Sequence, residues 1–325
     1  MDSFLFAVGV VMPLIILVAI GYALKRSGLF SVATAKAVNK IVFRLLIPAT
    51  LFLNVYNVDE IGAIDLTYII YTAAVTLIVF LVSLPLSGVI TKDGGRRGVI
   101  SQVMYRSNYA LIGLPLVESI YGSGGLAEAA LLSVVSVSFF NIFAVISLSV
   151  FGRSGRISVR KILTDIVKNP LIQSIVLAII ILMIRSVLVR YGIDFRLSDI
   201  KPLFTAIKYM SNAATPVALL CLGAQFEFSD VKAMRKEIIC GVAIRTVIVP
   251  VIGIGLAYVL FDFSGAVFAA LIAAFATPVS VSSAPMAQEM GCDSTLAGQL
   301  VLWTTVVSSV TLFLFIYALK LLNVF

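Results

Sequence analysis

The sequence predicts an all-α membrane protein with ten transmembrane helices, built as an inverted repeat of five and five. Three observations lead to this fold class: the composition, the spacing of the apolar runs, and landmarks shared by the two halves. Apolar residues make up 61% of the 325 residues and charged residues only 12%, and the mean hydropathy is +1.11. A soluble domain has about a quarter of its residues charged, so the expected environment is lipid.

Ten apolar runs are bounded by charged or turn residues, and each is long enough to cross, or nearly cross, a hydrocarbon core of about 30 Å. The second run starts with a polar stretch whose lysines and arginine can reach the headgroups. The expected helices are residues 4–24, 41–56, 66–90, 98–120, 126–150, 170–189, 203–222, 238–260, 266–290 and 296–322.

The basic residues predict the orientation, because lysine and arginine accumulate in cytoplasmic loops. The odd-numbered loops hold fifteen of them, among which are Arg153 and Arg156, and the opposite side holds six. The second loop, in contrast, carries only the acids Asp59, Glu60 and Asp65. Both termini are therefore expected on the extracytoplasmic side. The net charge of +8 is explained by these loops, so no nucleic acid partner is expected.

The two halves of the chain share landmarks at a nearly constant offset. Pro48 corresponds to Pro216, Pro115 to Pro285, and Leu126-Ala127 to Leu296-Ala297. Because each half contains five helices, the second half enters the membrane inverted, as in many secondary transporters. The predicted repeats are residues 1–163 and 164–325.

The fourth and ninth helices carry polar residues, glycine or proline at mid-span, in corresponding positions. We expect both helices to be broken there, since irregular backbone inside a membrane needs protein or water to satisfy it. Their half-helix N-termini would face a shared site and favour an anion such as a carboxylate. The expected binding residues are Ser107, Asn108, Tyr109, Gly113, Thr277, Ser280, Ser282 and Ser283, and the expected helix-breaking residues are Pro115, Pro278 and Pro285. The alternative is that the hydroxyls bond back to the helix and the prolines only kink it.

The segment 106–116 resembles the motif R-G-N-x-G-F-x-G-x-P-L of the auxin efflux carrier family. Arg106, Asn108, Gly113, Pro115 and Leu116 match it, whereas Ser107, Ala110 and Leu111 replace a Gly, a Gly and a Phe. The ninth helix is similar to the Pro…Ala-x-Glu segment of that family.

The resemblance implies a fold related to the bile acid symporters and the sodium–proton antiporters. Helices one, two, six and seven would form a scaffold, and helices three to five and eight to ten would form a moving transport domain, in a homodimer. It implies a secondary carrier of small organic anions in a bacterial plasma membrane, working by an elevator mechanism with H⁺ or Na⁺ as the coupling ion. Auxin itself is not assumed, because the segment between the halves is short and the motif is changed.

Three arginines, Arg44, Arg106 and Arg245, fall within expected spans, where charged residues are functional candidates. Arg106 could attract an anion or pair with Glu118 or Glu289. For Arg44 and Arg245 the favoured interpretation is a side chain that reaches the cytoplasmic headgroups. The chain has no histidine, which excludes a histidine proton switch.

Other functions were weighed against the carrier. An intramembrane metalloprotease needs histidines, and the aspartates Asp65 and Asp262 lie at helix ends, so no enzyme, cofactor or metal is expected. A sodium-coupled, bile-acid-like symporter, a channel-like pore and a sensor without transport remain alternatives. The substrate, the coupling ion and the direction of flux do not follow from the sequence.

Overall fold

A computed structural model describes residues 2–56, 66–121, 126–152, 159–261, 263, 265–322 and 324. The loop acids Asp59, Glu60 and Asp65, together with Arg153, Arg156 and Asp262, lie outside the described residues. Within the described part of the chain the structure is almost entirely helical, and helices occupy each of the ten predicted stretches.

Among its described residues the first half contains seven α-helices, some joined end to end. They are α1 (Asp2–Arg26), α2 (Val32–Ile41), α3 (Ile47–Tyr56), α4 (Leu66–Ile90), α5 (Gly94–Tyr105), α6 (Leu114–Tyr121) and α7 (Leu126–Phe151). A π-helical turn, η1 (Val42–Leu46), joins α2 to α3, and a second one, η2 (Tyr109–Gly113), leads directly into α6.

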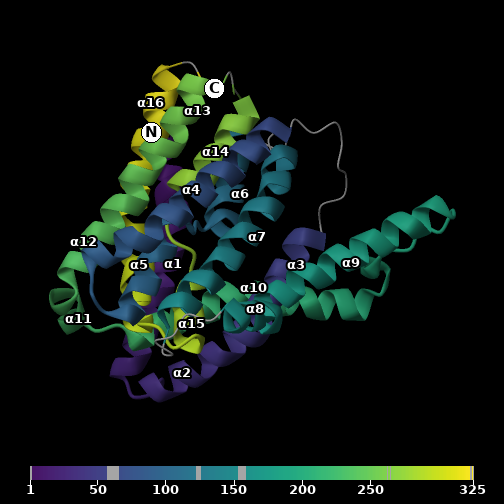
Figure 1. The fold of residues 1–325 in the computed structure, drawn as a ribbon. Helices are drawn as coiled ribbons and strands as arrows, with labels where there is room; N and C mark the ends of the chain where they lie inside the picture. The colour runs from purple at the N-terminus through teal and green to yellow at the C-terminus, as the bar shows by residue number, and fades with distance from the viewer. Residues whose placement is uncertain are drawn as a thin grey trace.

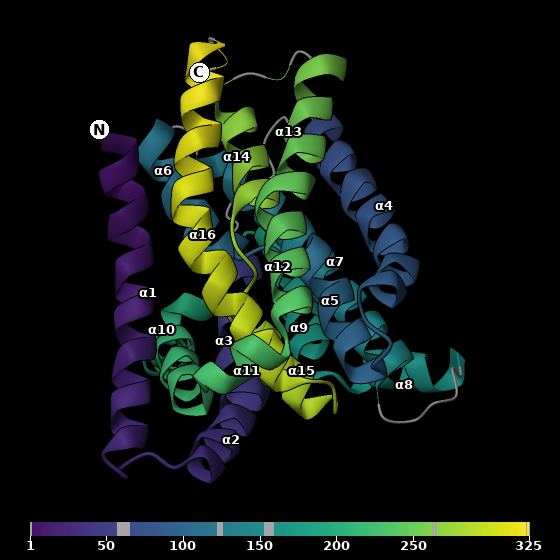
Figure 2. The same cartoon turned by 90° about the vertical axis from the view of Figure 1, so that its left-hand side faces the viewer.

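The second half begins after α8 (Val159–Lys168), a helix that contains the predicted repeat boundary. It comprises α9 (Pro170–Arg190), the short η4 (Leu197–Asp199), α10 (Lys201–Gln225), α11 (Phe228–Ala233), α12 (Arg235–Ala243), η5 (Ile244–Ile248), α13 (Val249–Leu260), α14 (Gly265–Ala276), α15 (Ser283–Glu289) and α16 (Ser294–Leu321). The start of α1 and the end of α16 lie at the same end of the molecule (Figure 2).

Six helices of the described chain are long and apolar enough to cross a membrane: Val32–Tyr56, Leu66–Ile90, Glu128–Phe151, Pro170–Arg190, Arg235–Leu260 and Ser294–Leu321. Tyr109–Tyr121 and Gly265–Ala276 are shorter apolar helices. These helices agree with a multi-pass membrane protein. The number of ten crossings and the inverted repeat stay predictions.

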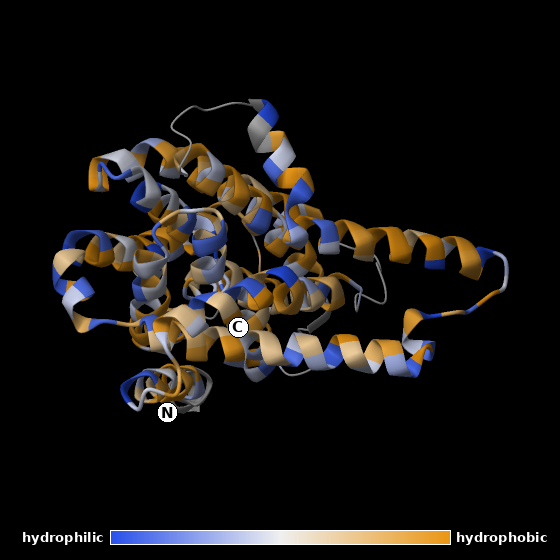
Figure 3. Cartoon of the chain, turned by 90° about the horizontal axis from the view of Figure 1, so that it is seen from below, coloured by the Kyte–Doolittle hydropathy of each residue, from blue (hydrophilic) through white to orange (hydrophobic). Residues whose placement is uncertain are grey.

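The helices pack in two groups, which meet where α1 packs on α16. In the first group α10 lies against α1, α2 and α3, and α3 lies against α9. In the second group α5 packs on α4 and α7, α14 packs on α6, α7 and α13, and α16 packs on α12 and α15. The end of α9 and the start of α10 project beyond the other helices (Figure 1), and α9 is hydrophobic along most of its length (Figure 3).

Glycines allow the two helices of the closest pair, α1 and α10, to touch backbone to backbone. A Cβ on Gly21 would lie 2.2 Å from the Leu220 carbonyl oxygen, and a Cβ on Gly223 would lie 2.0 Å from that of Val18. Small residues at such crossings favour helix association in a bilayer, where apolar burial gives no advantage.

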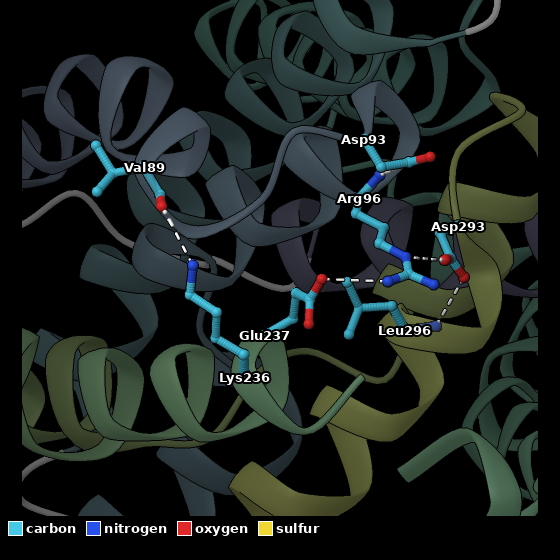
Figure 4. Close-up of polar contacts among 7 residues, drawn as sticks. All are labelled: Val89, Asp93, Arg96, Lys236, Glu237, Asp293 and Leu296. Atoms are coloured by element: carbon cyan, nitrogen blue, oxygen red, sulfur yellow. Dashed lines mark hydrogen bonds and ion pairs between the residues drawn. The ribbon is translucent and has the colours of Figure 1, made fainter. Parts of the chain in front are cut away.

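Arg96, at the start of α5, links three helices of the second group at one end (Figure 4). Its Nη1 donates to Glu237 on α12 at 3.1 Å, and its Nε donates to Asp293 at 3.1 Å. Asp293 also caps α16 by accepting the Leu296 N–H. One side chain thus connects three helices of the same group.

Candidate functional site: a crossover of two broken helices

The fourth and ninth helices are broken and cross each other at the breaks. Helix α5 ends at Tyr105, and α14 ends at Ala276. Beyond these ends Ser107 and Val279 form an antiparallel β-bridge, and the Asn108 N–H donates to the Pro278 carbonyl at 2.8 Å. Each break therefore satisfies part of the backbone of the other, as a buried irregular segment requires.

The second break has a local cause in Pro278. Proline lacks the N–H that would continue α14, and it disfavours helical backbone at the preceding residue, Thr277. At the first break the Asn108 carbonyl restarts the helix by accepting from the Ile112 and Gly113 N–H groups.

A cavity of about 550 Å³ lies between this crossover and the first helix group. From the crossover it is lined by Arg106, Ser107, Asn108, Tyr109, Ala110, Leu111, Ser280, Val281 and Ser282. The facing wall comes from α1, α3, α7 and α10, and includes Thr50, Asn54, Asn141, Ser211 and Asn212 beside leucines and other apolar side chains.

Arg106 contributes a buried positive charge to this cavity, with 2% of the residue exposed. Its Nη2 donates to Ser282 Oγ at 2.8 Å and to Asn141 Oδ1 at 2.9 Å. Its Nη1 contacts Gln102 Oε1 at 3.1 Å and Met286 Sδ at 3.0 Å. All four partners are neutral, and no Asp or Glu is among the described residues that line the cavity.

Three further polar groups of the cavity wall have no hydrogen-bond partner within the described part of the chain. They are Ser107 Oγ, Asn108 Nδ2 and Asn54 Nδ2. Two are amide N–H donors, and the third is a hydroxyl that can donate or accept. Buried polar groups are normally hydrogen-bonded, so these three groups are available to hydrogen-bond with a polar ligand.

The helix Tyr109–Tyr121 begins at the cavity, and its first residues, Tyr109, Ala110 and Leu111, are part of the lining. The first N–H groups of a helix have no acceptor within it, and its N-terminus carries partial positive charge. Together with Arg106 they give the cavity an electrostatic preference for anions.

Five of the eight expected binding residues line the cavity, and the other three lie near the crossover without lining it. Ser107, Asn108, Tyr109, Ser280 and Ser282 line the cavity. The Tyr109 hydroxyl, however, points to α7 and donates to the Ala129 carbonyl at 3.1 Å. The hydroxyls of Ser280 and Ser282 are 2.8 Å apart, so Ser280 is linked to Arg106 through Ser282.

Thr277, Ser283 and Gly113 do not line the cavity. Thr277 is buried, and its hydroxyl donates to the Ala273 carbonyl one turn earlier. Ser283 is fully buried in α15, and Gly113 lies against α14, where an added Cβ would be 2.9 Å from the Ala273 Cβ. These three positions shape the crossover rather than the cavity surface.

The prolines were expected in the breaks, but only Pro278 lies in one. Pro115 and Pro285 are within the first turns of α6 and α15. A proline in a first turn, such as Pro285, lacks only an N–H that needs no intrahelical acceptor. Pro115 lies just after the π-helical turn η2, where the regular α-helical hydrogen-bond pattern is already interrupted.

The expectation for Arg245 was wrong. It is fully buried in η5 rather than directed to the headgroups. Its Nε and Nη2 donate to the Thr277 carbonyl at 2.9 and 2.7 Å, and further contacts reach the carbonyls of Ala274 and Met104. Arg245 therefore satisfies the C-terminal ends of both broken half-helices, which carry partial negative charge.

The proposed partners of Arg106 also differ from the expectation. Glu289, at the end of α15, pairs with Arg44 at 3.2 Å, and Glu118 is exposed on α6. The Arg44 side chain is 70% exposed, in agreement with a position near the headgroups. Neither glutamate contributes to the cavity lining.

Asn54, Asn141 and Asn212 are site residues that the sequence reasoning missed. Each is an isolated asparagine within an apolar run, and polar residues in membrane spans are functional candidates. Attention to this signal in helices other than the interrupted ones would have found them.

The family model described as membrane transport protein matches residues 6–316. The chain belongs to this membrane transport protein family. Two proteins described as uncharacterised transporters are similar to it. An uncharacterised transporter of Methanothermobacter thermautotrophicus is 24% identical over 310 residues, covering 93% of this chain and 95% of the relative. An uncharacterised transporter of Methanocaldococcus jannaschii is 27% identical over 240 residues, 72% of each chain.

Family membership confirms the transporter part of the sequence prediction and supports transport rather than catalysis. It agrees with the resemblance to auxin efflux carriers found in the fourth helix. The fold relationship to bile acid symporters stays a prediction.

Proposed function

We propose that this membrane transport protein is a secondary carrier of a small organic anion, most simply a carboxylate, that binds at the crossover. The observation that carries the proposal is the buried Arg106 guanidinium, which contacts only neutral partners. A charge in the membrane interior is costly unless it is paired. An anion in the cavity would supply the missing partner.

The neighbouring groups suit the same ligand. Ser107 Oγ and Asn108 Nδ2 are unpartnered beside Arg106, and the N-terminus of Tyr109–Tyr121 opens onto the cavity. Several donors and no described carboxylate surround one space. A carboxylate accepts such donors through both oxygens.

Alternating access by an elevator motion is the second part of the proposal. It is supported by the two helix groups, with the cavity between them. At one end the groups are held by polar contacts: Gln288 accepts from Asn39 at 3.2 Å and donates to the Lys36 carbonyl at 2.8 Å, and Glu289 pairs with Arg44. The groups also meet where α1 packs on α16, so the proposed motion has to rearrange both these polar contacts and that packing. A homodimer, as the resemblance implies, belongs to the same proposal.

Ligand binding to purified protein tests the site. A panel of small carboxylates is screened by thermal shift, each beside its uncharged amide, and only the carboxylates should stabilise. The Asn108→Ala variant removes a hydrogen bond to a charged group, worth about 1.5–3 kcal/mol, so affinity should fall about 10- to 150-fold. The Arg106→Gln variant should lose more.

Asn39→Ala is the matched control, since Asn39 is a buried asparagine bonded to Gln288 outside the cavity. It should bind with unchanged affinity even where its melting temperature falls. Full-affinity binding by Asn108→Ala, or equal losses in both variants, would contradict the assigned site.

Counterflow in proteoliposomes separates a carrier from a pore. Vesicles preloaded with the anion should take up labelled anion faster than empty vesicles, and uptake should saturate. A pore gives flux that rises linearly with concentration and shows no exchange.

A further inference from the structure

Helix α8 connects the two halves of the chain and is amphipathic. Its apolar residues Leu163 and Val167 lie one turn apart and are exposed, whereas Ile166 packs against the core. It follows α7 and leads through the cap Asn169 directly into α9. Because α7 and α9 are both long and apolar enough to span a membrane, α8 must lie at the membrane surface. Figure 2 shows it projecting from the other helices.

The outward face of α8 combines apolar and basic side chains. A shallow groove on this face is lined only by residues of α8 and is flanked by Arg160 and Lys168. Between these two bases, Leu163 is 57% exposed and Val167 is 68% exposed. Large apolar residues presented next to bases are typical of helices that lie in a bilayer interface.

The acid of this helix is turned away from that face. Asp165 accepts a hydrogen bond from Ser149 of α7 at 2.9 Å. The neighbouring Ile166 also packs against the core. The outward face is left with positive charge at both ends and apolar side chains in the middle.

We propose that α8 is a membrane-surface helix whose outward face binds anionic phospholipid. Leu163 and Val167 enter the upper acyl region, and Arg160 and Lys168 extend to the phosphates. A negatively charged leaflet attracts each base near its surface by about 1 kcal/mol, or about fivefold. The carrier is therefore sensitive to the charge of its bilayer through a helix that joins the two groups.

The first test locates α8 in the bilayer. The chain has one tryptophan, Trp303, so Trp303→Phe combined with Leu163→Trp gives a single reporter. In vesicles with brominated phospholipid its fluorescence should be quenched. Trp303→Phe with Leu81→Trp, at a lipid-exposed position within α4, is the positive control. A reporter at 163 that emits as in water, while the one at 81 is quenched, overturns the proposal.

The second test measures lipid charge preference. The full-length protein in detergent is titrated with phosphatidylglycerol or phosphatidylcholine, and the melting temperature gives an apparent affinity for each. The Arg160→Gln/Lys168→Gln variant should lose preference for phosphatidylglycerol by up to roughly 25-fold.

The matched control is Lys232→Gln/Arg235→Gln, which removes the same charge from exposed bases of α11 and α12. It should retain the preference of the unmodified chain. Equal stabilisation of the unmodified chain by both lipids, or equal losses in both double variants, overturns the proposal. A quenched reporter at 163 without any charge preference refutes the headgroup part, and an acidic protein partner would leave the reporter unquenched.

Discussion

Arg106 and Arg245 are two buried arginines that contact residues of the same crossover, and they have different surroundings. Arg106 contacts side chains and opens onto a cavity. Arg245 contacts backbone carbonyls and does not line that cavity. A charge held by helix C-termini is already compensated, whereas one held by neutral amides and hydroxyls is not. Arg245 is therefore suited to a structural role, and Arg106 is suited to ligand binding.

Replacement of Arg245 by methionine should therefore destabilise the protein strongly. Arg245→Met leaves the buried carbonyls of Thr277, Ala274 and Met104 without their donor, at about 1–3 kcal/mol for each unsatisfied group. The melting temperature of the purified variant measures this loss. Arg44→Met is the control, because the exposed Arg44 pair should contribute at most about 1 kcal/mol. Equal melting temperatures would contradict the role of Arg245.

Cys292, in the turn between α15 and α16, should be an unreactive thiol. Burial raises its pKa to about 12, and the carboxylates of Asp293 and Asp93 contribute to the increase. Since the thiolate is the reactive form, the fraction that reacts should rise tenfold per pH unit.

The measurement is the rate of alkylation by iodoacetamide in a Cys221→Ala/Cys240→Ala variant between pH 7 and pH 10. The rate should still be rising at pH 10. An ordinary thiol, with a pKa near 8.5, levels off by then, and a plateau of that kind would be inconsistent with the raised pKa of Cys292.

At the scale of elements, the broken fourth helix depends on a close approach to α14. Gly113 lies so near Ala273 that an added Cβ would be 2.9 Å from the Ala273 Cβ. Gly113→Ala should push η2 away from α14, reducing both stability, by about 1–3 kcal/mol, and anion affinity. Because the obstacle is one methyl group, the Gly113→Ala/Ala273→Gly double variant should recover much of both.

Gly255→Ala, on α13, is the control for this pair. A Cβ there meets open space, and alanine is the better helix former by about 0.5–1 kcal/mol. The melting temperature and the ligand affinity of these three variants test the prediction. Failure of Ala273→Gly to rescue would show that the contact does not limit the crossover.

Apolar runs and turn residues allowed the helices to be predicted from the sequence, because lipid demands long uninterrupted apolar segments. The predicted ranges 66–90 and 126–150 agree with α4 and α7. The break at Pro278 was predictable from the missing N–H. The start of the second helix was not, because Lys36 and Lys40 conceal α2 from a hydropathy argument.

The site could be predicted only in part. Polar residues at mid-span indicated Ser107, Asn108, Ser280 and Ser282, but not which side chains turn towards the cavity. Thr277, like Ser280, is a hydroxyl residue at mid-span, yet the Thr277 hydroxyl donates to a backbone carbonyl of α14. The burial of Arg245 depends on carbonyls from two distant segments, and no local pattern indicates it. Helix α8 is not among the ten predicted helices, because its basic residues resemble those of a cytoplasmic loop.

At the scale of the whole molecule, the distribution of bases predicts the orientation in the membrane. A cysteine introduced at Arg196 should react with a membrane-impermeant maleimide in intact cells. A cysteine at Arg156 should react only after the membrane is opened. The native cysteines are replaced first so that the signal is specific. Reaction at position 156 in intact cells would contradict both the orientation and the inverted repeat.

The energy source of transport is a second whole-molecule prediction. We expect uptake to follow a proton gradient or the membrane potential more than sodium, because the described cavity lining holds no carboxylate for a metal ion. Uptake into proteoliposomes is measured at fixed pH and voltage with sodium or potassium outside. Unchanged uptake is the expected result, and loss of uptake on replacing sodium by potassium would refute the prediction.

The bond from Arg106 to Ser282 joins residues that are 176 positions apart, and this has a consequence during translation. When Arg106 enters the bilayer, the ribosome has yet to make the segment that will hold it. The half-made chain carries an unsatisfied charge and an open backbone break. The insertion machinery or bound water must stabilise this charge and this break until the ninth helix is inserted. Truncated chains that stop before Ser282 should therefore be recognised as defective and degraded. Formation of the crossover would thus distinguish chains that contain the ninth helix from chains that lack it.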